Sequence, residues 1–168
     1  MLTAAIIAEY NPFHQGHAYH IAKTRELGAT HIAVIMSGDF VQRADAAILP
    51  KRVRAKLAIE HGADLVVELD APHATATAEY FAKGALYLAD ALGCVQALSF
   101  GCEEGDITIL ERAAAALDAP DTRARLKSYL AEGMSFAAAR ARALYDTGGT
   151  ALADLLTMPK DVYKRQQV

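Results

Sequence analysis

Four short apolar runs, separated by segments of helical periodicity, constrain the fold of this chain more than any other feature. The runs lack the polar–apolar alternation of a strand with one face in water. They are Ala4–Ala8, His31–Met36, Leu65–Val67 and Ala97–Phe100. Helical patterns separate them at His17–Leu27, from Pro50 to Gly62 and at Ala78–Leu92. Such an alternation predicts a parallel sheet covered on both faces, in the α/β, Rossmann-like doubly wound class.

The chain changes character after Asp106, where it becomes alanine-rich and helical. Helical patterns follow at Ile107–Leu117, Thr122–Leu130 and Phe136–Tyr145, and Gly148-Gly149 ends the last one. We therefore expect a Rossmann-like nucleotide-binding domain over residues 1–106 and a helical extension over residues 107–168.

Composition limits the classes of partner and compartment. A formal charge of −3 and a pI near 6.0 argue against a chain that grips nucleic acid unaided, so an RNA contact needs a local patch. The apolar runs are too short for a transmembrane helix, and the N-terminus lacks the pattern of a signal peptide. Cys94 and Cys102 form no CxxC and no disulfide scaffold, which favours a cytoplasmic location.

Ligands of open parallel sheets bind beyond the carboxyl ends of the strands. The segments that follow the four predicted strands hold most of the polar and glycine-rich residues of this part of the chain. They are residues 9–17, 37–43, 68–77 and 101–106. We expect the functional site at this edge.

The first of these segments reads EYNPFHQGH and contains an HxGH pattern. Gly16 allows close approach of backbone to a phosphate, and the helix expected from His17 offers unpaired N–H groups and a positive dipole end. The imidazoles of His14 and His17 add directed donors, which matter most as charge grows on a phosphorane-like transition state. We predict that this loop binds ATP and that His14 and His17 assist attack on its α-phosphate.

Two other interpretations of the histidines remain open. They can cap a helix in a solvated loop. His14, His17 and His20 are also spaced three residues apart, which is compatible with a zinc site, although no Cys or carboxylate partner is suitably spaced. We assign no metal ligand.

A basic cluster lies between residues 51 and 56. Lys51 and Arg54 are candidate contacts for pyrophosphate or a tRNA backbone, and the alternative is a solvated helix face. Arg43, which follows the turn at Ser37-Gly38-Asp39, is a further candidate phosphate contact. Three apolar positions are assigned to the core and not to cofactor contacts: Phe81, Leu86 and Leu88.

Five blocks occur in order along the chain: EYNPFHQGHAYH, MSGDFVQR, KRVRAKLAIEHGADLVVEL, AEYFAKGA and LSFGCEEGD. Together they resemble the bacterial tRNA(Met) cytidine acetate ligase family of the HxGH nucleotidylyltransferase superfamily. The resemblance is close from Leu2 to Asp106 and looser over the helices beyond. HxGH alone would indicate only the superfamily, whereas the ordered blocks are typical of the ligase.

The resemblance implies that ATP and acetate form acetyl-adenylate and pyrophosphate, and that the acetyl group then passes to N4 of the wobble cytidine of elongator tRNA(Met). It implies that His14 and His17 stabilise the triphosphate and its transition state, while His20 orients them. A triphosphate usually travels with Mg²⁺, but no residue indicates a requirement for it. The implied ATP contacts are Ile7, Ala8, Glu9, Tyr10, Asn11, Pro12, Phe13, His14, Gln15, Gly16, His17, Ala18, Tyr19, His20 and Gly101.

The chain departs from the family pattern at several positions. Lys160 stands where an Asn that helps to bind ATP is expected, and the segment that would carry a second nucleotide-contacting Arg is absent. We therefore expect a truncated N-terminal portion that folds its α/β layer but ligates poorly or not at all. Ala44 replaces a usual glycine, Asp70 stands where proline is common, and Cys102 stands where Ser is more frequent.

Two alternative functions share the same loop. One is an HxGH adenylyltransferase of coenzyme biosynthesis, and the other is a non-catalytic nucleotide-binding module. Acetate is encoded by no residue and enters only through the resemblance. The sequence does not indicate an oligomeric state.

Overall fold

The computed structural model describes residues 1–101 and 107–150, apart from the side chain of Arg43. It divides the chain into two compact units, Met1–Gly101 and Cys102–Val168. The expected boundary after Asp106 stays a prediction, because residues 102–106 lie outside the described ranges. Cys102 and the tail from residue 151 onward, with Lys160, lie outside them as well.

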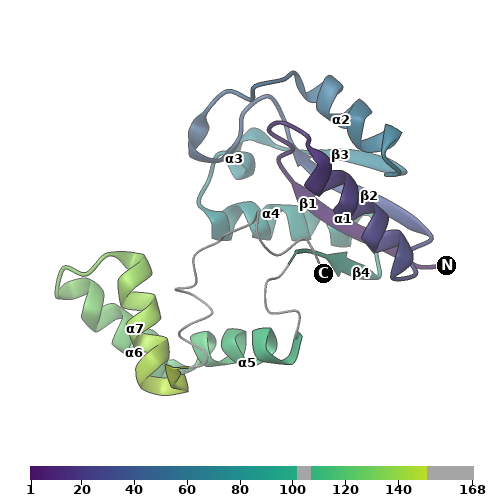
Figure 1. Ribbon diagram of the computed structural model, residues 1–168. Coiled ribbons are helices and arrows are strands. Elements are labelled where there is room, and N and C mark those ends of the chain that lie inside the picture. The colour runs from purple at the N-terminus through teal and green to yellow at the C-terminus, as the bar shows by residue number, and fades with distance from the viewer. Residues whose placement is uncertain (102–106, 151–168) are drawn as a thin grey trace. The chain divides into compact units, whose positions relative to one another are not determined.

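One sheet of four parallel strands, in the order β3-β2-β1-β4, forms the centre of the first unit (Figure 1). The strands are β1 (Thr3–Ala8), β2 (His31–Ser37), β3 (Leu65–Leu69) and β4 (Ala97–Ser99). β1 is central: the chain first winds outward through β2 to β3, and then returns to add β4 on the other side of β1. This order is doubly wound, so the predicted fold class is confirmed.

Helices cover both faces of the sheet. One face packs against α1 (Gln15–Glu26) and α2 (Lys51–Glu60), and the other against α3 (Ala71–Ala74) and α4 (Ala78–Ala91) (Figure 1). Successive strand residues point to opposite faces, so β1 divides its side chains between two cores. The first core includes Ile6, Ile21, Ile32, Val34 and Ala58. The second includes Ala5, Ile35, Leu69, Ala74 and Ala85.

Several elements differ from the sequence-based expectation. α1 begins at Gln15, two residues before the expected start at His17, because His14 caps it. The short helix α3 and the 3₁₀ turn Gln42–Ala44 were not expected. Leu88 packs against the second core as predicted, whereas the prediction for Leu86 was wrong, because its side chain is 44% exposed.

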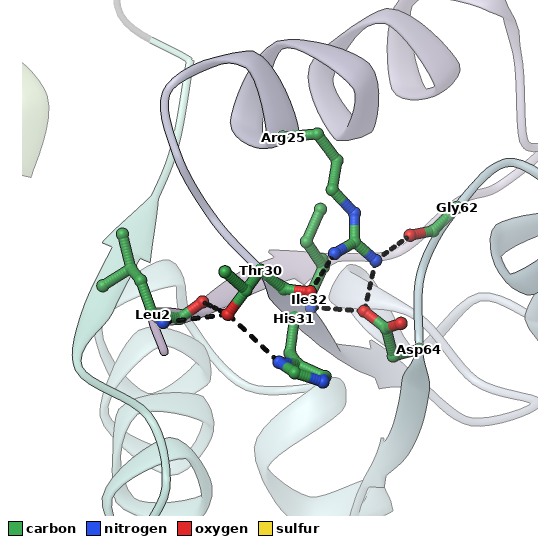
Figure 2. Close-up of polar contacts among 7 residues, drawn as sticks. All are labelled: Leu2, Arg25, Thr30, His31, Ile32, Gly62 and Asp64. Atoms are coloured by element: carbon green, nitrogen blue, oxygen red, sulfur yellow. Dashed lines mark hydrogen bonds and ion pairs between the residues drawn. The ribbon is translucent and has the colours of Figure 1, made fainter.

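A polar network holds the amino-terminal edge of the sheet together (Figure 2). The guanidinium of Arg25, near the end of α1, donates to the carbonyls of Thr30 and Gly62 and to the carboxylate of Asp64. The same carboxylate accepts from the backbone N–H of Ile32 at 2.7 Å. Arg25 thereby links α1, the start of β2 and the turn before β3, on the side opposite to the expected site.

The described part of the second unit consists of α5 (Ile107–Asp118), α6 (Pro120–Ala131) and α7 (Phe136–Gly148). Its small core joins Ala113 of α5 to Leu144 of α7. No helix within the described ranges combines the length and the hydropathy that a membrane span requires.

The 3₁₀ turn contains Ala44 in the left-handed region, with a φ of 60°. This is the position where the resemblance leads us to expect glycine. An L-residue loses about 1 kcal/mol in this region, a cost that glycine does not have.

We therefore predict that Ala44→Gly leaves the free energy of unfolding unchanged or raises it by up to about 1 kcal/mol, even though glycine also makes the unfolded chain more flexible. Ala46→Gly in the same loop is the matched control, because Ala46 is not among the described residues with positive φ. It should lower the free energy of unfolding by roughly 0.5–1 kcal/mol. Urea denaturation would measure both, and equal destabilisation by the two substitutions would contradict the strain at Ala44.

Candidate functional site

The loop between β1 and α1 is closed by two reciprocal hydrogen bonds between side chains and backbone. His14 is the N-cap of α1, and its Nδ1 accepts from the N–H of Gly16 at 3.1 Å. His17 Nδ1 accepts from the N–H of His14 at 3.2 Å. A neutral imidazole that accepts at Nδ1 carries its proton at Nε2. Both rings are thus fixed with an Nε2–H donor that no described residue accepts.

These bonds modify the expectation of unpaired amides at the helix start. The N–H of Gly16 pairs with the His14 ring, and the N–H of His17 donates to the carbonyl of His14 at 2.9 Å. Helix capping, one of the interpretations left open by the sequence, is therefore observed. It is compatible with phosphate binding, because capping uses Nδ1 and leaves both Nε2–H donors beside the positive end of the helix dipole.

Aromatic packing beneath the loop sets the electrostatics of His17. Its ring lies 4.7 Å from that of the buried Tyr10 and 5.6 Å from that of Phe13, and it stacks on His14 at 3.6 Å between ring centroids. Burial, with smaller contributions from His14 and His20, lowers the pKa of His17 to about 4. His17 is therefore a neutral donor at pH 7 and contributes no positive charge.

A pocket of about 430 Å³ opens at the carboxyl end of β1. Most of the predicted ATP contacts line it: Ile7, Ala8, Glu9, Tyr10, Asn11, Pro12, His14, His17 and His20. The other predicted contacts are not among its lining residues: Phe13, Gln15, Gly16, Ala18, Tyr19 and Gly101. Phe13 instead packs on the first core and against His61, with ring centroids 4.9 Å apart.

Two lining residues were missed as site residues, Gln42 and Phe81. Phe81 was assigned to the core; it does pack against the second core, but it also reaches the pocket. Gln42 lies in the MSGDFVQR block. Its position in the segment that follows β2 was the only feature of the sequence that indicated a place in the site. Its N–H donates to Glu9 Oε1 at 2.8 Å, which joins the two loops.

Arg54 supports this edge from beneath. The residue has no exposed surface, and its guanidinium donates to the carbonyls of Leu49 at 2.9 Å, Glu9 at 2.6 Å and Ser37 at 3.1 Å, and also to that of Gly38. The expectation that Arg54 contacts phosphate or tRNA does not fit this environment, because the side chain is inaccessible and its donors already serve backbone carbonyls. Burial also lowers the pKa of Arg54.

Lys51 lies at the start of α2 among carboxylates. Its Nζ is 2.7 and 2.8 Å from the two oxygens of Glu68 and 3.7 Å from Asp39 Oδ2. The hydrogen bond to Glu68 is the main cause that raises the pKa of Lys51. The side chain of Arg43 is not described. No Lys or Arg is among the residues that line the described pocket.

The described residues do not support the alternative of a metal site. Within residues 1–101 and 107–150, no three His, Cys, Asp or Glu side chains are grouped so as to hold a metal ion. His14 and His17 use Nδ1 on the backbone, and His20 Nε2 lies 3.0 Å from Ser99 Oγ. The geometry supports the binding of an oxyanion by two neutral donors.

Comparison with known proteins gives consistent results. A family model described as HIGH Nucleotidyl Transferase matches residues 1–163. The chain is 43% identical to the tRNA(Met) cytidine acetate ligase of Caldanaerobacter subterraneus subsp. tengcongensis and 47% identical to that of Caldicellulosiruptor bescii, over 89% and 88% of its own length. It spans only 38% and 37% of those proteins. The resemblance inferred from the five blocks is thus confirmed.

A solved structure supports the fold. The crystal structure of Thermotoga maritima TmcAL bound with alpha-thio ATP is 38% identical in sequence and superposes with a TM-score of 0.85. The match covers 93% of this chain and 39% of the other.

The first prediction from this site concerns Arg54. We expect Arg54→Met, which keeps much of the side-chain volume, to lower the free energy of unfolding by roughly 3–5 kcal/mol, because four carbonyls lose a donor in a buried place. Arg52→Met is the control, since Arg52 is exposed on the same helix, and it should change stability by less than about 0.5 kcal/mol. Urea denaturation of both variants would decide, and equal small effects would remove Arg54 from its supporting role.

The buried, neutral ring of His17 should make the stability of the chain depend on pH. The pKa of His17 is about 4 in the folded chain and about 6.5 when unfolded, so between these values the unfolded state binds more protons. The stability contributed by neutral His17 is therefore complete above about pH 6.5 and is lost as pH falls toward 4, by on the order of 2 kcal/mol after allowance for partial exposure of the ring.

His17→Gln should flatten this dependence, because Gln at the same helix position can still accept from the N–H of His14 without titrating. His31→Gln, at an exposed histidine, should leave the dependence as it is in the original chain. The measurement is the free energy of unfolding at pH 5 and pH 7.5. Burial also lowers the pKa of His20, so part of the slope should remain, and a slope as steep in His17→Gln as in the original chain would show that the His17 ring is not held neutral.

Proposed function

The chain belongs to the HIGH nucleotidyl transferase family, and from this premise we propose that it binds ATP at the His14–His17 loop and activates acetate by adenylation. Acetate oxygen attacks the α-phosphate, pyrophosphate leaves, and acetyl-adenylate forms. N4 of the wobble cytidine of elongator tRNA(Met) then attacks the acetyl carbon, AMP leaves and N4 loses a proton, in the cytoplasm. The curated relatives are longer and carry the name of this activity, so the transfer is proposed for the whole ligase of which this chain matches a part.

One observation carries the proposal: two imidazoles are locked with Nε2–H as their free donor at the start of α1, beside a pocket at the carboxyl end of β1. Neutral donors cost less to bury than cations. Donors fixed before the reaction stabilise charge as it develops on the phosphate oxygens without reorganising. His14 and His17 are accordingly proposed as catalytic residues.

The remaining predicted contacts are proposed with specific roles. Residues 7–20 and Gly101 surround the nucleotide. Arg43 and Lys51 meet pyrophosphate or the tRNA backbone, and Lys51 must then exchange part of its pairing with Glu68 for phosphate. The lining includes Glu9 and no Lys or Arg among its described residues, so the charge of the triphosphate needs a further counterion. Mg²⁺ that enters with ATP would supply it.

ATP–pyrophosphate exchange tests the proposal. We expect exchange that depends on acetate, and a loss of roughly 100-fold or more in His17→Ala, because a donor to the transition state is removed. His31→Ala is the matched control, since it removes an exposed histidine outside the pocket lining. Parallel reactions with and without Mg²⁺ determine whether the metal is needed.

Other outcomes would select the alternatives. Exchange that requires a phosphorylated coenzyme precursor instead of acetate would identify a coenzyme adenylyltransferase. ATP binding by calorimetry with no exchange for any acceptor would identify a nucleotide-binding module. An exchange rate unchanged by His17→Ala would remove this residue from catalysis.

A further inference from the structure

The side chains of His20 and Thr24, on α1, and of Ser99, on the edge strand β4, form a chain of hydrogen bonds. His20 Nε2 lies 3.0 Å from Ser99 Oγ, and Ser99 Oγ lies 2.6 Å from Thr24 Oγ1. Thr24 Oγ1 lies 2.8 Å from the carbonyl oxygen of His20, one turn back along α1. Thr24 is buried, and the other two residues are half-buried.

The number of protons in this chain fixes the direction of each hydrogen bond. A carbonyl oxygen only accepts, so the single hydroxyl proton of Thr24 is used on the His20 carbonyl. Ser99 must therefore donate its own proton to Thr24. Ser99 then has no proton for His20, so His20 Nε2–H donates to Ser99 Oγ. The neutral ring consequently has no proton at Nδ1.

Nδ1 is thus the polar atom of His20 that is left for a ligand. His20 lines the pocket, whereas neither Ser99 nor Thr24 is among its lining residues. Within the described residues, no hydrogen bond is formed by His20 Nδ1. Burial lowers the pKa of His20, which keeps the ring neutral and Nδ1 an acceptor.

The three histidines that line the pocket therefore differ in hydrogen-bonding role: two are donors and one is an acceptor. His14 and His17 offer donors, which suit phosphate oxygens. His20 offers a lone pair, which repels phosphate oxygens and suits an N–H or O–H group. On a nucleotide, the ribose hydroxyls and the exocyclic amino group of adenine are such donors.

We propose that His20, held by Ser99 and Thr24 in the Nε2–H form, is a specificity-determining residue that accepts a hydrogen bond from the nucleoside part of the nucleotide. This inference rests on the proposed binding of ATP in the pocket. It assigns His20 a contact of its own, in place of the orienting role that the resemblance implied.

The first test reads the tautomer directly and needs no ligand. Long-range ¹H–¹⁵N correlation spectra of the histidine rings at pH 7.5 should show the His20 ring protonated at Nε2 and unprotonated at Nδ1. His20→Phe identifies its signals by their loss. In Ser99→Ala, the ring should shift toward a mixture of both tautomers. A His20 ring protonated at Nδ1 in the original chain would overturn the inference.

The second test measures dissociation constants by calorimetry for four nucleotides: ATP, 2′-deoxy-ATP, 3′-deoxy-ATP and purine riboside triphosphate, which lacks the amino group. We expect one analogue to bind roughly three- to tenfold more weakly than ATP, the effect of one hydrogen bond. His20→Phe keeps a ring but has no acceptor, so it should bind that analogue and ATP equally. The analogue concerned identifies the donor as a ribose hydroxyl or as the amino group.

The outcomes separate this inference from the proposed function. If His20→Phe binds ATP but discriminates among the four nucleotides as the original chain does, His20 makes no such contact and the proposed function stands. If the original chain binds none of the nucleotides, the proposed function fails and the nucleoside contact fails with it. His20→Leu, which also has no acceptor, repeats the measurement should His20→Phe not fold.

Discussion

The guanidinium of Arg54 is the interaction on which the carboxyl edge of the sheet depends. Parallel strands end with carbonyls that no following strand residue can pair, and a loop that leaves the sheet must still satisfy them. Arg54, on α2, donates to the carbonyls of Glu9, which follows β1, of Ser37, which ends β2, and of Gly38, which follows β2. Its fork of donors, fixed in one plane, suits several carbonyls better than the point charge of lysine would. The pocket residues are arranged on this support.

His14 and His17 use one ring nitrogen for the structure of the loop and leave the other for the ligand. Nδ1 of His14 and of His17 closes the start of α1, and this is what leaves Nε2–H free at the pocket. The cap therefore determines the tautomer, and the tautomer determines what the site can bind. His20 carries its proton on Nε2 as well, but there the proton is used on Ser99 Oγ, so the atom left free is the acceptor Nδ1.

The electrostatics of the site follow from its packing. Tyr10 and Phe13 fill the space beneath His17, and the resulting burial keeps the imidazole neutral. Lys51 is engaged by Glu68 and Asp39 at the same edge of the sheet. In a chain with a formal charge of −3, the described lining of the pocket thus offers oriented neutral donors and includes no Lys or Arg. Specific binding of a polyanion then depends on geometry more than on attraction at long range.

Local sequence determined the four strands, the longer helices and the position of the HxGH loop, because hydrophobic periodicity and the helix-ending glycines act over a few neighbouring residues. The start of α1 at Gln15 was missed because histidine is an uncommon N-cap. The cap is formed by two bonds, from the N–H of Gly16 to the His14 ring and from the N–H of His14 to the His17 ring. The burial of Arg54 was decided by carbonyls 5 to 45 positions away in the chain, and Phe81 reached the pocket because β1 and α4 meet across the sheet. Only the tertiary fold brings these partners into contact, because they lie in different segments of the chain and residue spacing within one segment does not predict contacts between segments.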